Sequence, residues 1–230
     1  MRAIVIKNFY SKTNTFLLEG KKAQHLLHVA RVKIEEEVKI LDGTGHSYLT
    51  KVLNIKKKVI ELEILEKRES KPKKLNLAVS FGLTKKESFE LSIKQLVEIG
   101  IQEINILSTE YSQRYEVKED RMESIIESAM EQSNQANYPI IKFQNFDEYL
   151  ENEKNQIIYF SSIETENKDL IVNKNKKYNL LLGPEGGLSR KEESKVAEKG
   201  SLVIHLPTNI LRTSTAVNFC SGYTLGKLNL

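Results

Sequence analysis

The sequence predicts an α/β protein in two parts: a small β-barrel with one helix, then a larger, mostly parallel sheet covered by helices. Three observations lead to this fold class. Residues 37–65 alternate apolar and polar positions in short runs, as strands do. From residue 75 onward, apolar runs alternate with stretches of helical period, which is typical of a parallel sheet. Residues 1–73 hold 16 Lys and Arg against 9 Asp and Glu, and the remaining residues hold 19 against 22.

The first part, expected to form a domain over residues 1–70, begins with a strand at residues 3–6 and a short helix at residues 22–30. The apolar residues of this helix share one face: Ala23, Leu26, Leu27 and Ala30. Three strands should follow, at residues 37–43, 46–55 and 59–65. The sequence Asp-Gly-Thr-Gly separates the first two and predicts a turn. The charged segment 67–74, which contains Pro72, is expected to be a linker.

The second part, expected over residues 74–230, contains six apolar runs that predict strands. These runs are residues 75–81, 103–107, 139–143, 156–161, 178–182 and 202–206. Amphipathic stretches between or after them predict helices at residues 85–100, 118–133, 146–150, 189–200 and 216–228. Gly100 is a typical helix end. Strands alternating with helices indicate a mostly parallel sheet covered on both faces.

Two loops at the carboxyl ends of predicted strands are candidates for ligand binding, because open α/β sheets bind ligands there. Residues 183–187, Gly-Pro-Glu-Gly-Gly, form the first, and either a structural bend or a close approach to a ligand would explain its glycines. Ser189 and Glu192 form a capping-box pattern that should begin the next helix. In the second loop, residues 207–213, the apolar pair Ile210 and Leu211 should be covered by a ligand ring, a partner chain or the other loop.

The hydroxyl residues after this loop suggest how the last helix begins. One hydroxyl among Thr213, Ser214 and Thr215 is expected to cap that helix.

Several functional classes find no support in the chain. It contains no dinucleotide-binding GxGxxG, no P-loop and no GxSxG nucleophile elbow. Its four histidines, His25, His28, His46 and His205, lack partners at ligand spacing, so no metal site is predicted. The single cysteine, Cys220, cannot form an intramolecular disulfide and is expected to be a small buried hydrophobe.

The length and charge of the chain bear on its location and partner. No apolar run approaches the roughly 20 residues of a membrane-spanning helix, and the N-terminal apolar run is too short for a signal peptide. A soluble, cytoplasmic protein with no membrane partner is therefore predicted. The basic first part suggests a polyanionic partner, although a lysine-rich solvated surface would have the same composition.

The segments LLLGPEGGLSRKE and LPTNILRTSTAV resemble the two signature segments of the RsmE family. These are SPOUT-class knotted methyltransferases that methylate N3 of a uridine in small-subunit ribosomal RNA. The segments MRAIV, QHLLHVARV and ILDGTGHSY resemble the PUA-like RNA-binding domain of the family, and KQLVEIGIQEI and AMEQSNQANYP resemble the first helices of its catalytic domain. The resemblance covers nearly the whole chain in order.

The resemblance implies a PUA-like small β-barrel and a SPOUT domain with a deep C-terminal trefoil knot that holds S-adenosyl-L-methionine in a bent shape. It also implies a homodimer with a site near the subunit interface. The cofactor-binding residues implied by the matched motifs are Phe160, Ser161, Leu182, Gly183, Pro184, Glu185, Gly186, Gly187, Leu206, Ile210, Leu211 and Thr213.

Arg212 is the one catalytic residue that the resemblance implies. Uridine N3 must lose its imide proton before it can attack, and a cation beside the uracil carbonyls would stabilise the developing anion. Glu185 is expected to anchor its loop through backbone N–H groups rather than to act as a base, and no general base can be named. The residues expected to grip rRNA phosphates are Arg2, Lys7, His28 and Arg31.

The chain departs from the family pattern at Gln135, Leu188, Pro207, Asn209 and Ser214. The family usually has glutamate at position 214 and arginine at positions 135 and 209. No catalytic role is therefore assigned to a second arginine or to an acid. Two alternative functions stay open. One is a SPOUT RNA methyltransferase acting on another nucleotide, and the other is a non-catalytic RNA-binding factor in ribosome assembly. Naked rRNA and the assembled small subunit are both candidate substrates.

Overall fold

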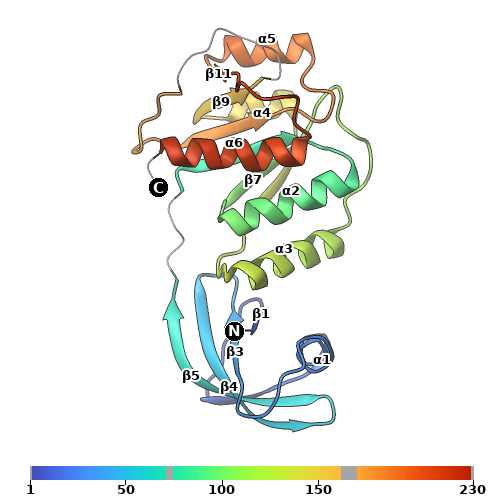
Figure 1. Ribbon diagram of the computed structural model, residues 1–230, viewed down its shortest axis with the longest axis vertical. Coiled ribbons are helices and arrows are strands. Elements are labelled where there is room, and N and C mark those ends of the chain that lie inside the picture. Colours follow the sequence, from blue (N-terminus) through green and yellow to red (C-terminus); the bar gives the residue numbers. More distant parts are fainter. Residues whose placement is uncertain (1, 71–74, 162–169, 229–230) are drawn as a thin grey trace. The chain divides into compact units, whose positions relative to one another are not determined.

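The computed structural model describes residues 2–70, 75–161 and 170–228 (Figure 1). The chain divides into two compact units. The first consists of Met1–Lys73 together with Ile126–Tyr138, and the second of Lys74–Ile125 together with Pro139–Leu230. None of the helices in these ranges has the length and apolarity needed to cross a bilayer.

The first unit is built on a five-stranded sheet with the order β1-β3-β4-β5-β2. The strands are β1 (Arg2–Val5), β2 (Thr15–Leu18), β3 (Glu37–Leu41), β4 (His46–Lys56) and β5 (Val59–Glu69). β1 pairs with β3 in parallel, and the other pairs are antiparallel. Within the described residues no ladder joins β1 to β2, so strand pairing does not close the predicted barrel. The inward residues form one core, in which Ile4, Leu26, Ile40, Ile60 and Leu62 are fully buried.

The helix predicted at residues 22–30 begins earlier and changes its geometry along its length. It starts as α1 (Gly20–Gln24) and continues as the π-helix η1 (His25–Val29). Ala23 and Leu26 are fully buried, which confirms the predicted apolar face. β2 was not predicted, because four residues of mixed exposure carry too short an alternation to recognise. β5 continues to Glu69, so the expected linker begins within a strand, and residues 71–74 lie outside the described residues.

Residues 126–138, which are distant in sequence, pack within the first unit. Glu131 accepts a hydrogen bond from the backbone N–H of Val5 at 2.9 Å and lies 3.3 Å from the ammonium of Lys22. The Asp-Gly-Thr-Gly turn also binds this segment, because Gly45 N–H donates to the carbonyl of Ala136 at 3.0 Å. The sequence patterns gave no sign of these long-range contacts.

The second unit contains six strands in one parallel sheet, with the order β11-β9-β10-β6-β7-β8. The strands are β6 (Leu77–Gly82), β7 (Glu103–Ser108), β8 (Ile140–Asn145), β9 (Gln156–Phe160), β10 (Tyr178–Leu182) and β11 (Leu202–Ile204). All six predicted strands are present, and every pair is parallel. Every residue of β6 and β10 is buried, as expected for a sheet covered on both sides. Most of these residues are apolar, and the two polar side chains, Ser80 and Asn179, hydrogen-bond to each other at 2.7 Å.

Helices cover both faces of this sheet (Figure 1). α2 (Lys86–Ile99) and α6 (Thr213–Lys227) pack against each other on one face, and α6 contacts β10 and β6. On the other face, α4 (Phe146–Asn152) and α5 (Arg190–Glu198) bury their apolar residues against β7, β9 and β10. The remaining helix is α3 (Glu119–Ser133). α2 ends as predicted at Gly100, which has a φ of 96°.

Candidate active site at the carboxyl ends of the parallel strands

The end of β10 and the loop after β11 meet the end of β9 around a pocket in the second unit, which we call the first pocket. It encloses an empty volume of about 490 Å³ that includes open solvent. Six of the residues predicted to bind the cofactor line it: Phe160, Ser161, Leu182, Leu206, Ile210 and Leu211. Residues from three separate strand ends therefore come together, as the order of the sheet requires.

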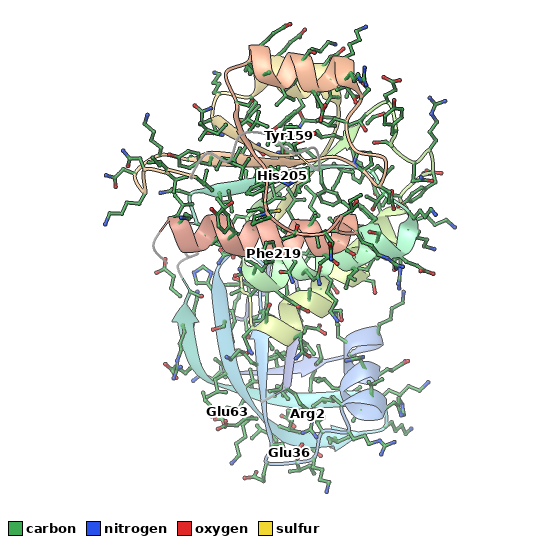
Figure 2. The ribbon with its side chains drawn as sticks, turned by 45° about the horizontal axis from the view of Figure 1, so that its top comes forward. Arg2, Glu36, Glu63, Tyr159, His205 and Phe219 are labelled. Carbon is green, nitrogen blue, oxygen red and sulfur yellow. The ribbon has the colours of Figure 1, made fainter. Side chains whose placement is uncertain are left out.

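Five further lining residues of the first pocket were not predicted: His205, Thr208, Asn209, Ala216 and Cys220. Ala216 and Cys220 are one helical turn apart on α6, so a helical face directed at the predicted loops could have identified them. His205, labelled in Figure 2, has its Nδ1 atom 3.3 Å from the carbonyl oxygen of Ser161. That contact links the end of β11 to the end of β9.

The walls of the first pocket differ in exposure. Phe160 is 7% exposed and packs edge to face on Tyr223, with 6.1 Å between the ring centroids. Cys220 is 3% exposed, as predicted for a small buried hydrophobe, and burial raises the pKa of its thiol to about 12. Ile210 is 90% exposed, so nothing in the described part of the chain provides the cover expected for it.

The glycine-rich loop is a tight turn in which Gly183 and Gly186 lie close to other atoms and Gly187 has a positive φ. Gly187 N–H donates to the carbonyl of Pro184 at 2.9 Å, and Gly187 has a φ of 74°. A Cβ atom on Gly183 would lie 2.7 Å from the carbonyl carbon of Gly187. A Cβ atom on Gly82, at the end of β6, would lie 2.5 Å from Pro184 Cδ. A Cβ atom on Gly186 would lie 3.0 Å from the Cβ atom of Tyr111. None of these glycines nor Pro184 lines the first pocket.

Glu185 fixes this loop to the start of α2. Its Oε1 atom accepts a hydrogen bond from the backbone N–H of Lys85 at 2.9 Å, which confirms the predicted anchoring through a backbone N–H group. The loop is also held at its far end, where Ser189 and Glu192 form the predicted capping box of α5. The other carboxylate oxygen of Glu192 accepts from the N–H of Glu110 at 2.9 Å. The loop is thus anchored at both ends.

A second pocket lies beside the glycine-rich loop, with an empty volume of about 900 Å³ that includes open solvent. Its lining residues are Lys85, Glu87, Ser88, Leu91, Glu185, Arg212 and Ser214. Arg212, the predicted catalytic residue, therefore lines a different pocket from the six predicted cofactor residues of the first pocket. Leu211 and Arg212 are adjacent in sequence and contribute to different pockets.

The start of α6 corrects one prediction. The helix begins at Thr213, its N-cap is Arg212, and no side chain forms a cap hydrogen bond there. Thr213, Ser214 and Thr215 occupy the first helical positions, where their backbone is already helical, so the expected hydroxyl cap is wrong. Thr213, a predicted cofactor residue, is 4% exposed and is not among the lining residues of either pocket.

In the first unit, two of the predicted RNA-binding residues already have partners. Arg2 forms an ion pair with Glu36 (Figure 2). The Lys33 backbone N–H, at 2.9 Å from the Glu36 carboxylate, lowers the pKa of that carboxyl, and Arg2 lowers it further. The ammonium of Lys7 lies 4.3 Å from the centroid of the Tyr138 ring.

His28 and Arg31 are exposed near the end of η1. Sequence analysis overlooked three consecutive lysines, Lys56, Lys57 and Lys58, at the turn between β4 and β5. All three are exposed, and within the described residues none has an ion pair. The run of three lysines at a turn between two predicted strands could have identified them as candidates for binding RNA phosphates.

In the described ranges no three or more His, Cys, Asp or Glu side chains are grouped so that they could hold a metal ion. His46 instead belongs to the turn after β3, where its Nδ1 atom lies 3.0 Å from Asp42 Oδ2. Asp42 is 4% exposed and also accepts hydrogen bonds from Thr44.

Comparison with known proteins identifies the class first. Residues 71–224 match the family described as RNA methyltransferase domain, and residues 18–65 match the one described as RNA methyltransferase PUA domain. With the parallel sheet and the pockets at its carboxyl edge, these matches place the chain in the class of RNA methyltransferases.

The ribosomal RNA small subunit methyltransferase E of Buchnera aphidicola subsp. Schizaphis graminum is 30% identical, covering 93% of this chain and 91% of the relative. That of Aquifex aeolicus is 30% identical, covering 91% and 94%. The chain therefore belongs to the family of ribosomal RNA small subunit methyltransferase E.

Solved structures share the fold over nearly the whole chain. The ribosomal RNA small subunit methyltransferase E of Neisseria gonorrhoeae, solved bound to S-adenosyl methionine, has a TM-score of 0.87 at 23% identity and covers 98% of this chain and 97% of its own. A Legionella pneumophila protein in complex with the same cofactor has a TM-score of 0.81 at 22% identity, covering 97% and 96%. The likeness establishes the fold, and the match of residues 18–65 confirms the predicted PUA-like domain.

Proposed function

We propose that this protein is an S-adenosylmethionine-dependent methyltransferase that methylates N3 of a uridine in small-subunit ribosomal RNA. One observation carries the proposal: six residues that the family resemblance assigned to the cofactor line a single pocket at the carboxyl edge of the sheet. Membership of the family and the cofactor bound by the Neisseria relative support it.

The first pocket fits an adenine-containing cofactor. Leu182, Leu206 and Ile210 offer apolar surface for a ring, and the loop after β11, which is exposed over residues 207–210, offers backbone groups to its polar edge. A ring seated here would cover part of the exposed Ile210 side chain. S-adenosylmethionine supplies an electrophilic methyl group when bound. The glycine-rich loop, fixed through Glu185, would support this site from outside the pocket rather than line it.

Arg212 would act on the substrate from the second pocket. Uracil N3 carries an imide proton, and the negative charge that develops when this proton leaves spreads over the two adjacent carbonyl oxygens. A guanidinium beside them stabilises that charge in the transition state more than in the ground state, which accelerates the reaction. Arg212 has no ion-pair partner within the described residues, so its charge is available for this role.

The wider organisation is part of the proposal. The first domain, residues 1–70, would bind rRNA phosphates through exposed cations such as Arg31 and Lys57, since phosphate contacts set the register of the RNA. The catalytic domain, residues 74–230, would carry the trefoil knot of the SPOUT class. We further propose a homodimer in the cytoplasm, acting on rRNA alone or in the assembled small subunit.

Isothermal titration calorimetry with S-adenosylmethionine tests the proposal at its first step. We expect 1:1 binding per chain, weakened by substitution in the first pocket. No heat of binding would favour the non-catalytic assembly factor. Normal binding, with methyl transfer to rRNA at a base other than uridine, would favour a SPOUT enzyme that modifies another nucleotide.

A further inference from the structure

The second pocket lies at the N-termini of two long helices. Lys85 is the N-cap of α2, and Arg212 is the N-cap of α6. Neither N-cap side chain caps its own helix, so backbone N–H groups in both first turns lack the partner that such a cap would supply. At α2 the Glu185 carboxylate accepts only from the N–H of Lys85 itself. Such ends carry a partial positive charge, and here two of them line the same pocket.

Two cationic side chains add to this charge. Neither Lys85 nor Arg212 has an ion-pair partner among the residues described, although Glu87 and Glu185 line the same pocket. Glu185 accepts a hydrogen bond from the backbone N–H of Lys85 and forms no ion pair with the Lys85 ammonium. The two carboxylates disfavour a doubly charged phosphate here. They are compatible with a neutral group that acquires a single negative charge during the reaction.

Ser214 adds a hydrogen-bonding group to the second pocket. The residue is 7% exposed and lines the pocket, and its hydroxyl has no hydrogen-bond partner among the described residues. The hydroxyl is not one of the fully buried atoms, so it is accessible to a ligand in the pocket. Leu91, which is 45% exposed, supplies an apolar surface beside it. A flat ring with polar edges fits this combination.

We propose that the second pocket holds the uracil ring of the target nucleotide, and that Lys85 is a second catalytic cation that acts with Arg212. This inference rests on the proposed function. The imide anion carries its charge on both carbonyl oxygens, O2 and O4, on opposite sides of N3. A single cation reaches one side, whereas Lys85 and Arg212, from two different helices, can serve one oxygen each. Ser214 donates a further hydrogen bond to the ring edge.

The chemical step balances without any further reactant. The N3–H proton passes to water, and the electron pair left on N3 forms the bond to the methyl carbon. The bond from that carbon to sulfur breaks, so the positive charge of the sulfonium is lost and a neutral thioether leaves. Nearby positive charge favours the deprotonated imide and lowers its pKa, so more of the reactive anion is present near neutral pH.

The test compares Lys85→Met with Lys86→Met, the neighbouring exposed lysine that lines a different cavity. The loop anchor uses the backbone N–H of Lys85, so the side-chain change leaves it intact. We expect Lys85→Met to lower turnover at pH 7.5 by about 10- to 100-fold. Turnover should rise with pH in both proteins, and the pH at which it levels off should be about one to two units higher in Lys85→Met than in the wild type. Affinity for S-adenosylmethionine should stay within about twofold.

Lys86→Met should behave as the wild type, and Lys85→Arg should recover most of the turnover because it restores the charge. Unchanged turnover or an unshifted pH profile in Lys85→Met would overturn the proposal. So would a loss confined to the KM for RNA, since Lys85 would then be a phosphate contact. Failure of the wild type itself to bind S-adenosylmethionine would instead reject the proposed function, so the two failures are distinguishable.

Discussion

The two pockets at the carboxyl edge of the sheet differ in what forms them. The first is lined mainly by apolar side chains, with a few polar ones from the ends of β9 and β11, whereas the second is lined mainly by charged and hydroxyl side chains at two helix N-termini. The start of α6 contributes to both: Leu211 and Ala216 line the first, and Arg212 and Ser214 line the second. A helix start can therefore separate binding of one molecule from chemistry on another, because successive residues point in different directions.

The largest effect should come from the second pocket. Arg212→Ala should lower turnover by about 100- to 1,000-fold, because it removes a charge that acts mainly in the transition state. Affinity for S-adenosylmethionine should change less than about threefold. Single-turnover kinetics and calorimetry on the same preparation check both values, with the exposed Arg190→Ala as the control. Equal losses in turnover and affinity would make Arg212 a binding residue and remove the contrast between the pockets.

A substitution in the first pocket should show the opposite pattern. Ile210→Asp should weaken S-adenosylmethionine binding by about 10- to 100-fold, the range expected when a buried aliphatic contact of roughly 1.5–3 kcal/mol is lost. Turnover at saturating cofactor should stay close to that of the wild type. Since Ile210 is 90% exposed, the protein should fold normally. Ile171→Asp, at a residue 83% exposed outside both pockets, is the matched control, and equal effects of the two variants would contradict this assignment.

The glycine-rich loop allows a sharper comparison within one turn. Gly183→Ala should cost about 1–3 kcal/mol of unfolding free energy, because its Cβ would meet backbone atoms of Gly187 at under 3 Å. Gly187→Ala has open space and should cost only the roughly 1–2 kcal/mol of its positive φ. Urea denaturation measures both values, and Gly200→Ala, with a φ of 75° and open space, calibrates the second. A Gly183→Ala variant of unchanged stability would mean that the loop is looser than described.

The smallest effect concerns Cys220 in the wall of the first pocket. Burial raises the pKa of its thiol to about 12, from an ordinary value of 9.0. Its contribution to stability is therefore complete below pH 9 and is lost as the pH rises toward the folded value. The slope is at most about 1.4 kcal/mol per pH unit. The stability difference between wild type and Cys220→Ala should shrink between pH 9 and 11, and a constant difference over that interval would contradict the assignment.

Sequence patterns predicted the second unit more completely than the first. Its six strands are apolar runs that alternate with helices, and the family resemblance assigned Phe160, Leu182 and Leu206 to one site. The four-residue β2 and the contact of Glu131 with Val5 could not be predicted, because neither depends on local periodicity. Long-range packing decides such features.

Within the site, the direction of individual side chains limited the prediction. Leu211 was expected beside the cofactor and Arg212 beside the uracil, but only the geometry of the α6 N-terminus shows that they line two different pockets. Gly183 and Gly187 were expected to form a wall of the cofactor site. Their tight contact with each other depends on the fold of the turn, which a count of glycines does not give.

The most direct test of the central claim is the map of modified nucleotides in small-subunit rRNA from cells that lack this protein. We predict that N3-methyluridine disappears at one position, and that expression of the wild-type chain restores it whereas Arg212→Ala does not. An unchanged N3-methyluridine profile in the cells that lack the protein would contradict the proposed function.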